Sequence, residues 1–573
     1  MSIRVAGDAA LLVQADTDPG APARLRAAIL AENFHGILDI IPGAETVLVV
    51  AEPGHPGRTD LAHRLGELAS EVLAGADEAS AVTEVRVPGQ AAEAPAVEVP
   101  AVDIPVVYDG PDLAEVARET GLSPEEVVAR HAAGEYLVGW LGFSPGFGYL
   151  TGLDPALHVA RRKTPRTSVP AGSVAIAGPL AAVYPSTSPG GWRLLGRTTA
   201  RLWDEHREPP AALSPGQRVR FRPADEAGDP LDLFPAGTTA PDRQAWGEPE
   251  PAVRGRVLEI VRPGPLAVVA DLGRPGYGHL GVPRSGAADP DHLRLANRLV
   301  GNPEDAAGVE LTLGGAVLRF SAPPGRGPAW VALTGAPAPV RLDQGPGPGG
   351  AGGPAPRPAG DRGLADDSGL GVPFAVPAGA TLTVGRPATG VRSYLAVRGG
   401  LAVPPVLGSR SRDTLSGLGP APLRAGDRLP VGGTGACHPI VADVAPAAAV
   451  TPGPAELRVV AGPRDDWFTP EARHRLRTAV YQVTRDSNRS GLRLSGPDLP
   501  RSRPGELASE GMPLGALQVP PSGQPILFLA DHPVTGGYPV IAVVATADIG
   551  RAAQLRPGDT VRFRLIPAPV GQV

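Results

Sequence analysis

The sequence is poor in cysteine and in aromatic residues. Cys437 is the single cysteine, so the chain forms no internal disulfide and has no CxxC metal-ligand pair. The eleven histidines show neither HExxH nor HxxH spacing, and we therefore expect no metal site. Aromatic residues make up 4% of the chain and the net charge is −6, which argues against nucleic-acid binding, because that function favours a basic patch with interleaved aromatics.

Long apolar runs are missing as well. None reaches about 18 residues, the length that a membrane-spanning helix needs. The N-terminus lacks the basic and apolar segments of a signal peptide. We therefore expect a cytoplasmic protein without a membrane partner.

Glycine and proline, in contrast, are abundant, with 75 and 69 residues among 573. Without a collagen-like period they indicate many turns and short strands, so a mainly β protein with α+β parts is expected. A chain of this length exceeds one hydrophobic core, and three to four domains are expected.

A repeated segment closes each half of the chain. LSPGQRVRFR at 213–222 and LRPGDTVRFR at 555–564 each combine a Pro-Gly turn with an alternating strand, and LRAGDRLPVG at 423–432 is a weaker copy. The repeat favours two or three related β-rich barrels. A common turn before a strand is the alternative interpretation.

Helices and strands alternate at the N-terminus, which predicts a small α+β cap domain over 1–80. Its expected strands are 10–15 and 46–52, and its expected helices are 21–33 and 59–74. Further helices are expected at 111–120, at 123–133 with a capping box of Ser123 and Glu126, and at 289–300 with Asp289 as N-cap.

Polar, proline-rich stretches divide the rest. Residues 78–100 and 227–254 are expected linkers, and the low-complexity segment 344–366 is an expected disordered insertion. The domains that remain are 102–225, 255–450 (which contains the insertion) and 451–568.

The polar residues that could carry chemistry lie in five glycine-rich blocks. The first two, GWLGFSPGFGYL at 139–150 and PRTSVPAGSVAIAG at 165–178, offer Tyr149, Arg166 and Ser173. Aromatic packing and a solvated arginine are the alternatives there. Arg166 suits a carboxylate or phosphate because its guanidinium donates in a planar fork.

Three blocks lie in the second half. The segment 271–315 contributes Asp289 and Asn297, which we expect on roughly the same side of one helix. The segment 393–419 contributes Arg410. In the fifth, residues 509–542, the apolar strand ILFLA is followed by Asp531, Thr535 and Tyr538 around two glycines, with Arg489 shortly upstream.

Standard nucleotide and nucleophile motifs do not fit. A GxxxxGK[ST] phosphate loop is absent, and GYGHLG at 276–281 is followed by VPRSG rather than by a helix. GFSPG at 142–146 lacks the strand–turn–helix context of a nucleophile elbow.

The blocks carry a family resemblance. LGFSPGFGYL, PRTSVPAGSV and SPGGWRLLGRT resemble allophanate hydrolase subunit 1-like proteins, also called the B subunit of 5-oxoprolinase. GRPGYGHLGVPRSGAAD, VPPVLGSRSR and TGGYP resemble allophanate hydrolase subunit 2-like proteins, also called the C subunit of 5-oxoprolinase or the biotin-dependent carboxyltransferase and urea amidolyase-related family. The family's ADRQTTGGYP reads ADHPVTGGYP here, so we expect no direct role for residues 532–534.

The resemblance implies two cyclophilin-like β-barrel halves, each with an accessory domain: 102–225 as the barrel of the B-like half and 451–568 as the barrel that closes the C-like half. It also implies fused B and C subunits of an ATP-dependent 5-oxoprolinase, which opens the lactam of 5-oxoproline to glutamate with its separate A subunit, using ATP with Mg²⁺. A carboxyltransferase that moves CO₂ from the carboxybiotin of a partner to urea is the alternative, and a kinase-regulator binding module is the second. Lys163 is the single lysine and adjoins no methionine, so the chain itself carries no covalent biotin.

Either amide-type substrate needs its oxygen stabilised by arginine or N–H donors. We expect Asp531, Asp289, Asn297 and Tyr538 as catalytic residues. The expected substrate-binding residues are Tyr149, Arg166, Ser173, Arg410, Thr535 and Arg489.

Overall fold

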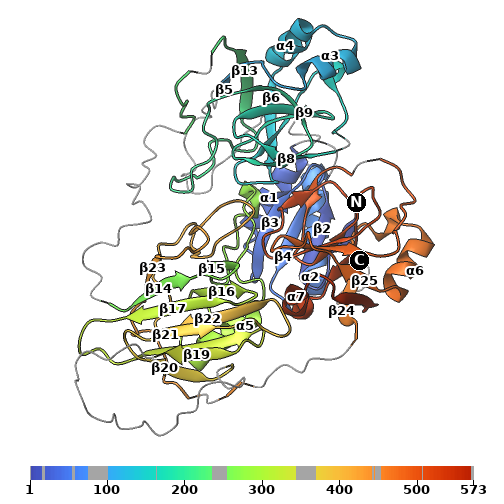
Figure 1. Ribbon diagram of the computed structural model, residues 1–573. Coiled ribbons are helices and arrows are strands. Elements are labelled where there is room, and N and C mark those ends of the chain that lie inside the picture. Colours follow the sequence, from blue (N-terminus) through green and yellow to red (C-terminus); the bar gives the residue numbers. More distant parts are fainter. Residues whose placement is uncertain are drawn as a thin grey trace, which may run out of the picture.

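The structure is a computed structural model. It describes residues 2–74 except 16, 17, 19 and 55–57; 101–234 except 163 and 227; 255–343; 370–445 except 442 and 443; and 453–568 except 506. An N-terminal α+β domain, a first barrel, a middle β-sandwich and a C-terminal barrel follow one another (Figure 1). The expected linker 78–100 and insertion 344–366 lie outside the described residues.

The N-terminal domain is a four-stranded antiparallel sheet in the order β1-β2-β4-β3 with two helices. Its elements are β1 (Ile3–Val5), β2 (Ala10–Gln14), α1 (Ala21–Ala31), β3 (Ile37–Pro42), β4 (Thr46–Ala51) and α2 (Arg58–Ala74). The expected β-α-β-α pattern is observed, with two further strands. Leu11 and Val13 pack in the helix-side core, whereas Ala10 and Leu12 pack on the opposite face against Val534 of the C-terminal barrel. Both faces are therefore covered, which explains the continuous apolar run of β2.

The first barrel is a seven-stranded sheet in the order β12-β9-β10-β7-β6-β13-β5. An antiparallel bridge between Val107 and Arg197 joins its two edges, so the sheet is nearly closed. Its elements are β5 (Val102–Val106), α3 (Leu113–Thr120), α4 (Pro124–Ala133), β6 (Tyr136–Leu141), β7 (Gly148–Thr151), η1 (Pro155–Leu157), β8 (Arg166–Val169), β9 (Ser173–Ala177), β10 (Leu180–Val183), β11 (Ser188–Gly190), β12 (Arg193–Arg197) and β13 (Arg218–Pro223). The capping box of Ser123 and Glu126 is confirmed.

The middle part is a sandwich of two five-stranded antiparallel sheets, β19-β21-β17-β14-β23 and β15-β16-β22-β18-β20, whose facing residues form one core. Its elements are β14 (Val257–Arg262), β15 (Leu266–Ala270), η2 (Gly278–Leu280), α5 (Pro290–Leu299), β16 (Gly308–Thr312), β17 (Ala316–Ser321), β18 (Ala329–Gly335), β19 (Val340–Asp343), β20 (Pro373–Val376), β21 (Thr381–Val384), β22 (Arg392–Val397) and β23 (Arg428–Pro430). Asp289 caps α5 as expected, because its side chain accepts from the His292 N–H.

The C-terminal barrel is closed in the order β24-β31-β28-β29-β26-β25-β32. Its elements are β24 (Ala455–Ala461), η3 (Asp465–Trp467), α6 (Pro470–Thr478), β25 (Tyr481–Val483), β26 (Gly491–Ser495), β27 (Glu510–Gly511), β28 (Ala516–Gln518), β29 (Ile526–Phe528), β30 (Thr535–Gly536), β31 (Val540–Val544), η4 (Thr546–Asp548), α7 (Ile549–Ala553) and β32 (Thr560–Leu565).

The sequence repeat marks the same structural step in both barrels. The copy at 213–222 leads into β13, which pairs parallel with β5, the first strand of its barrel. The copy at 555–564 forms β32, which pairs parallel with β24 in the same way. The weaker copy at 423–432 differs, because β23 is an antiparallel edge strand of the sandwich. The repeat therefore marks two related barrels, as expected, and no third one.

One part of the expected linker 227–254 belongs to the first barrel. The Asp232 carboxylate accepts from Arg207, and the Asp232 backbone forms a parallel β-bridge with Arg201. The Phe234 ring lies under the Arg207 guanidinium, whose Cζ is 4.5 Å from the ring centroid. An aperiodic sequence can pack on a barrel without forming a strand, so composition alone misplaced this boundary. Residues 235–254 lie outside the described part.

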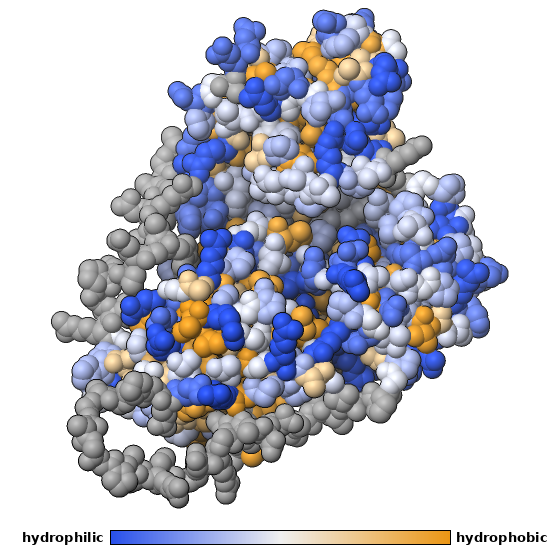
Figure 2. Space-filling view, viewed as in Figure 1, coloured by the Kyte–Doolittle hydropathy of each residue, from blue (hydrophilic) through white to orange (hydrophobic). Residues whose placement is uncertain are grey.

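Tight contacts hold the parts together. The first barrel stands as a separate lobe (Figure 2), and its Phe143 N–H donates to the Thr535 hydroxyl of the C-terminal barrel at 2.9 Å. A Cβ on Gly281 would lie 2.2 Å from the Ser144 carbonyl oxygen, so only glycine permits this approach of the sandwich to the first barrel. No helix among the described residues has the length and apolarity needed to span a membrane.

Candidate functional site

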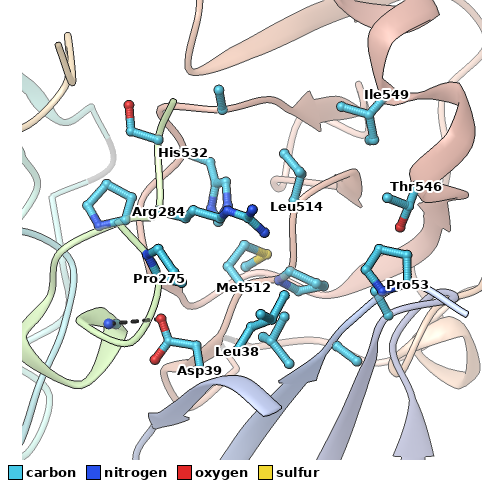
Figure 3. A pocket seen from close by; sticks show the side chains of 18 of the residues that line it. Leu38, Asp39, Pro53, Pro275, Arg284, Met512, Leu514, His532, Thr546 and Ile549 are labelled. Atoms are coloured by element: carbon cyan, nitrogen blue, oxygen red, sulfur yellow. Dashed lines mark hydrogen bonds between the residues drawn. The ribbon is translucent and has the colours of Figure 1, made fainter. Parts of the chain in front are cut away.

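A cavity of about 440 Å³ lies where the N-terminal domain, the sandwich and the C-terminal barrel meet (Figure 3). Each contributes one wall: residues 6–53, residues 272–294 and residues 512–549. Most wall side chains are apolar, and the polar ones include Asp39, Arg284, Ser285 and His532. A largely apolar cavity with a few polar groups is typical of a small-molecule site.

The N-terminal wall contains three carboxylate residues, Asp8, Asp39 and Glu52, and the pKa of Asp39 is shifted. Asp39 lies on β3, where its carboxylate accepts from the Ile40 N–H at 2.9 Å and from the Gly278 N–H of the sandwich at 3.0 Å. Burial raises the pKa of Asp39 to about 6, because these N–H donors and the nearby Arg26 charge offset only part of the desolvation. A carboxyl group with such a pKa exchanges protons near neutral pH, as a general acid or base must.

His532 lies on the C-terminal wall. Its Nδ1 lies 2.9 Å from the Pro533 carbonyl oxygen, which requires the proton on Nδ1 and leaves Nε2 as an acceptor. Burial lowers the pKa of His532, so the ring is neutral at physiological pH. The site therefore offers a neutral imidazole as well as a carboxyl group.

The sandwich contributes a glycine-rich loop that ends at helix α5. Ser285 in this loop has a φ of 54°, a left-handed conformation that costs free energy in a residue other than glycine. Its hydroxyl donates to Asp531 at 2.6 Å, which holds the strained residue in the cavity wall. The neighbouring Arg284 points into the cavity (Figure 3).

A buried network of charges lies behind this wall. Arg489 donates to Asp531 at 2.8 Å and 3.2 Å, to Glu310, and to the Gly286 carbonyl oxygen at 2.6 Å. Burial alone would raise the pKa of Asp531 and of Glu310, but the Arg489 charge outweighs it and both pKa values lie below the ordinary range. The network joins the sandwich to the C-terminal barrel and supports the wall at Ser285.

None of the ten predicted site residues is among the residues that line this cavity. Asp531 is fully buried between Ala530 and His532, which do line it. Arg489 is 3% exposed, and its donors are used by protein acceptors, which leaves it no contact with a ligand. Both residues lie directly behind the cavity wall.

Asp289 and Asn297 do not form the expected pair. The Asp289 carboxylate bonds to His292 at 2.6 Å and to Gln554 at 2.8 Å. The Asn297 amide donates to two carbonyl oxygens of the loop that follows α5 and accepts from Asn302. The two residues share no partner, because they lie at opposite ends of α5 and each bonds to the groups beside it.

Thr535 lies at the contact between the barrels, whereas the Tyr538 side chain contacts its own barrel. Thr535 is 2% exposed, and its hydroxyl accepts from the Phe143 N–H of the first barrel. The Tyr538 ring lies 5.6 Å from the Arg501 guanidinium of the C-terminal barrel. Thr535 therefore takes part in domain contact.

The three predicted residues of the first half lie in its barrel, away from the cavity walls. Tyr149 stacks on Trp140 at 4.5 Å within an aromatic cluster, which is the packing alternative for this block. Arg166 forms a bidentate pair with Asp112 at 2.8 Å and 2.9 Å. Ser173 donates to the Pro170 carbonyl oxygen at 2.8 Å.

Arg410, the last predicted residue, forms its hydrogen bonds within the sandwich. Its Nε donates to the Val403 carbonyl oxygen at 2.8 Å, and its backbone N–H donates to Asp271. Among the described residues, no three His, Cys, Asp or Glu side chains come close enough to hold a metal ion.

Sequence reasoning missed Asp39, Arg284 and His532. Asp39 is the one charged residue in ILDIIP, and a lone carboxylate in an apolar strand signals a buried polar group with a purpose. Arg284 lies next to Ser285 in the glycine-rich block 271–315. Residues 532 and 534 depart from the family's motif, so no direct role is predicted for them, yet His532 and Val534 both line the cavity.

Comparison with known proteins identifies the family. Residues 1–213 match the family model described as carboxyltransferase domain, subdomain C and D, and residues 280–565 match carboxyltransferase domain, subdomain A and B. The chain therefore belongs to the carboxyltransferase-domain family. The crystal structure of TTHA0988 has the same fold over nearly the full length, with a TM-score of 0.76, 34% identity, and coverage of 97% of this chain and 99% of that one.

Curated relatives fall into two groups. The C subunit of 5-oxoprolinase from Escherichia coli K12 is 36% identical over 312 residues, 54% of this chain and 90% of the relative. The B subunit of 5-oxoprolinase from Escherichia coli O157:H7 is 52% identical over 124 residues, 21% of this chain and 57% of the relative. Lachancea kluyveri urea amidolyase is 31% identical over 331 residues, 53% of this chain but 17% of the relative. The resemblance to the B and C subunits of 5-oxoprolinase is confirmed.

Proposed function

We propose that this chain combines the roles of the B and C subunits in an ATP-dependent 5-oxoprolinase, which opens 5-oxoproline to L-glutamate together with a partner related to the A subunit of that enzyme. The shared cavity carries this proposal. One wall lies in the region that matches subdomains C and D, and the other two lie mostly in the region that matches subdomains A and B. A cavity that needs both regions explains why two subunit-like parts act as one unit.

The wall chemistry suits the opening of an amide ring. The free Nε2 of His532 would accept a proton from an attacking water molecule. The Asp39 carboxyl, with its pKa of about 6, would donate a proton to the leaving ring nitrogen. The apolar walls limit access of further water and strengthen both polar interactions.

The cavity does not fit a triphosphate. The N-terminus of α5, where a phosphate would be favoured, is already capped by the Asp289 carboxylate. No described cluster of carboxylates offers a Mg²⁺ site there. We therefore derive no phosphoryl step in this cavity, and ATP with Mg²⁺ enters the proposal as co-substrate of the complete enzyme. A cytoplasmic location suits this need for ATP and stays a prediction.

The test is glutamate release from 5-oxoproline with ATP and Mg²⁺. This chain and a protein related to the A subunit of 5-oxoprolinase are assayed together and separately. Turnover that requires both proteins is expected. A correctly folded pair that releases no glutamate contradicts the proposal.

Variants connect the turnover to the cavity. Asp39→Asn and His532→Gln should each lower kcat by roughly 100-fold or more, the usual contribution of a general acid or base. Asp60→Asn is the matched control, because Asp60 is an exposed carboxylate on α2 of the same domain. Normal turnover by both cavity variants would exclude this acid–base assignment.

Carboxyl transfer is the second candidate, because half of the chain matches urea amidolyase. In that case the chain would move CO₂ from a partner's carboxybiotin to urea, and it would carry no biotin of its own. Transfer of labelled CO₂ from a carboxylated biotin protein to urea, without glutamate release, would favour this function.

A further inference from the structure

Arg284 is the feature of the cavity that the proposed acid–base chemistry does not use. Its Nε donates to the Leu272 carbonyl oxygen at 3.2 Å, and the rest of the guanidinium points toward the middle of the cavity (Figure 3). Within the described part of the chain, no carboxylate oxygen lies within 4.0 Å of it. Arg294, the other arginine in the wall, is already paired with Asp291 at 3.0 Å.

The surroundings of Arg284 leave its charge uncompensated. Partial desolvation by the cavity walls, together with the neighbouring Arg294 charge, lowers the pKa of Arg284, and Asp39 offsets part of this effect. Arginine remains charged in proteins nonetheless. Arg284 is an exposed residue of the cavity wall, so a ligand can reach its guanidinium, and an anion from outside the chain would supply the charge partner that it lacks.

The geometry restricts which anion fits. A guanidinium presents two parallel N–H donors, the arrangement that matches a carboxylate. The apolar side chains of the walls suit a small ring. The three arginines predicted to bind substrate, Arg166, Arg410 and Arg489, all have protein partners.

We propose that Arg284 binds the carboxylate of the substrate, so that the cavity selects a small anionic lactam over a neutral amide such as urea. This inference rests on the proposed function and deepens it. In this arrangement the ring lies between Arg284 and the apolar wall, and the amide group faces Asp39 and His532. Arg284 thereby decides between the two candidate substrates.

Ligand binding to the full chain tests this assignment without turnover. Isothermal titration compares 5-oxoproline with 2-pyrrolidinone, which has the same ring without the carboxylate, and with urea. The wild-type chain should bind 5-oxoproline at least about 10-fold more tightly than either neutral amide, as expected for a charge-assisted pair. Equal binding of the two lactams, or no binding of 5-oxoproline, would overturn the inference.

Two variants isolate the charge. Arg284→Met should weaken 5-oxoproline binding by roughly 10- to 100-fold and leave 2-pyrrolidinone binding unchanged, whereas Arg284→Lys should lie between. Arg298→Met, an exposed arginine on α5 outside the cavity wall, is the control. Circular dichroism verifies folding of each variant. Undiminished binding by Arg284→Met contradicts the assignment.

The proposed reaction and the proposed carboxylate site at Arg284 can be refuted independently of each other. Arg284-dependent binding of 5-oxoproline without glutamate release would refute the proposed reaction and keep the carboxylate site. Glutamate release with kcat/KM unchanged in Arg284→Met would refute the carboxylate site and keep the reaction.

Discussion

Replacing Arg489 by methionine should destabilise the junction between the sandwich and the C-terminal barrel. Arg489 is 3% exposed and bonds to Asp531, to Glu310 and to the Gly286 carbonyl oxygen. Methionine fills a similar volume but supplies no charge and no donor. The variant therefore leaves two buried carboxylates without their shared cation.

The expected cost is about 3–5 kcal/mol at pH 7.5, the usual effect of removing one partner from a buried ion pair. The cost does not exceed this range, because both carboxylates still accept a hydrogen bond in the variant: Glu310 from the Tyr394 hydroxyl at 2.9 Å and Asp531 from the Ser285 hydroxyl at 2.6 Å. Arg489→Lys keeps the charge but cannot reach all three acceptors, so about half of this cost is expected.

The pH dependence has a defined sign. In the wild type, the pKa values of Asp531 and Glu310 are lowered, so their contribution to stability is present above about pH 4 and is lost as the pH falls through the folded pKa values. In the variant, burial is no longer offset and both pKa values rise. The stability difference between wild type and variant should therefore be larger at pH 7.5 than at pH 5.

Urea unfolding followed by tryptophan fluorescence measures this difference. A multidomain chain unfolds in steps, so the transition shared by Trp330 of the sandwich and Trp467 of the barrel is compared. Arg493→Met, an exposed arginine on β26, is the control and should change little. A cost below about 1 kcal/mol, or one equal at both pH values, would refute the reasoning.

Three further predictions concern the first barrel. Burial lowers the pKa of His131 to about 3, so the neutral ring's contribution to stability is complete above about pH 6.5 and is lost as the pH falls. His131→Phe should lose about 1 kcal/mol of stability at pH 7.5, because the hydrogen bond to Tyr108 is lost, but its acid-unfolding midpoint should move to lower pH. Circular dichroism measures the midpoint, and an unmoved midpoint contradicts this prediction. Thr535→Val should cost about 1 kcal/mol and speed hydrogen exchange at the Phe143 amide, whereas unchanged exchange would exclude a role in joining the barrels. Ser123→Ala removes one half of a capping box and should cost about 1 kcal/mol, visible as faster exchange in the first turn of α4; protection as in the wild type would count against it.

The sequence predicted those structural features that depend on contacts between residues close together along the chain. The capping box at Ser123 and the N-cap at Asp289 were predictable because each cap bonds to a backbone group three residues away. The repeat at 213–222 and 555–564 predicted two related barrels, because the same turn and alternating strand close each one. The strand β3 was missed, since ILDIIP is apolar on both faces and shows no alternation.

The ten predicted site residues show how far residue type can mislead. Asp531 is predicted because it follows an apolar strand and precedes a glycine turn, and Arg489 because it lies shortly upstream of the same block. Those features do mark an important place, but the two side chains bond to each other and to Glu310 inside the protein. An arginine that serves a ligand and one that serves a buried carboxylate look the same in a sequence.

The sequence by itself determined the family, the two barrels and the caps of their helices, because these depend on motifs and on contacts between near neighbours along the chain. Only the tertiary structure decided which side chains share the cavity. Asp39, Arg284 and His532 are separated by hundreds of residues along the sequence. They meet because the N-terminal sheet buries its second face against the C-terminal barrel. That contact depends on the packing of whole domains, and no local pattern in the sequence encodes it.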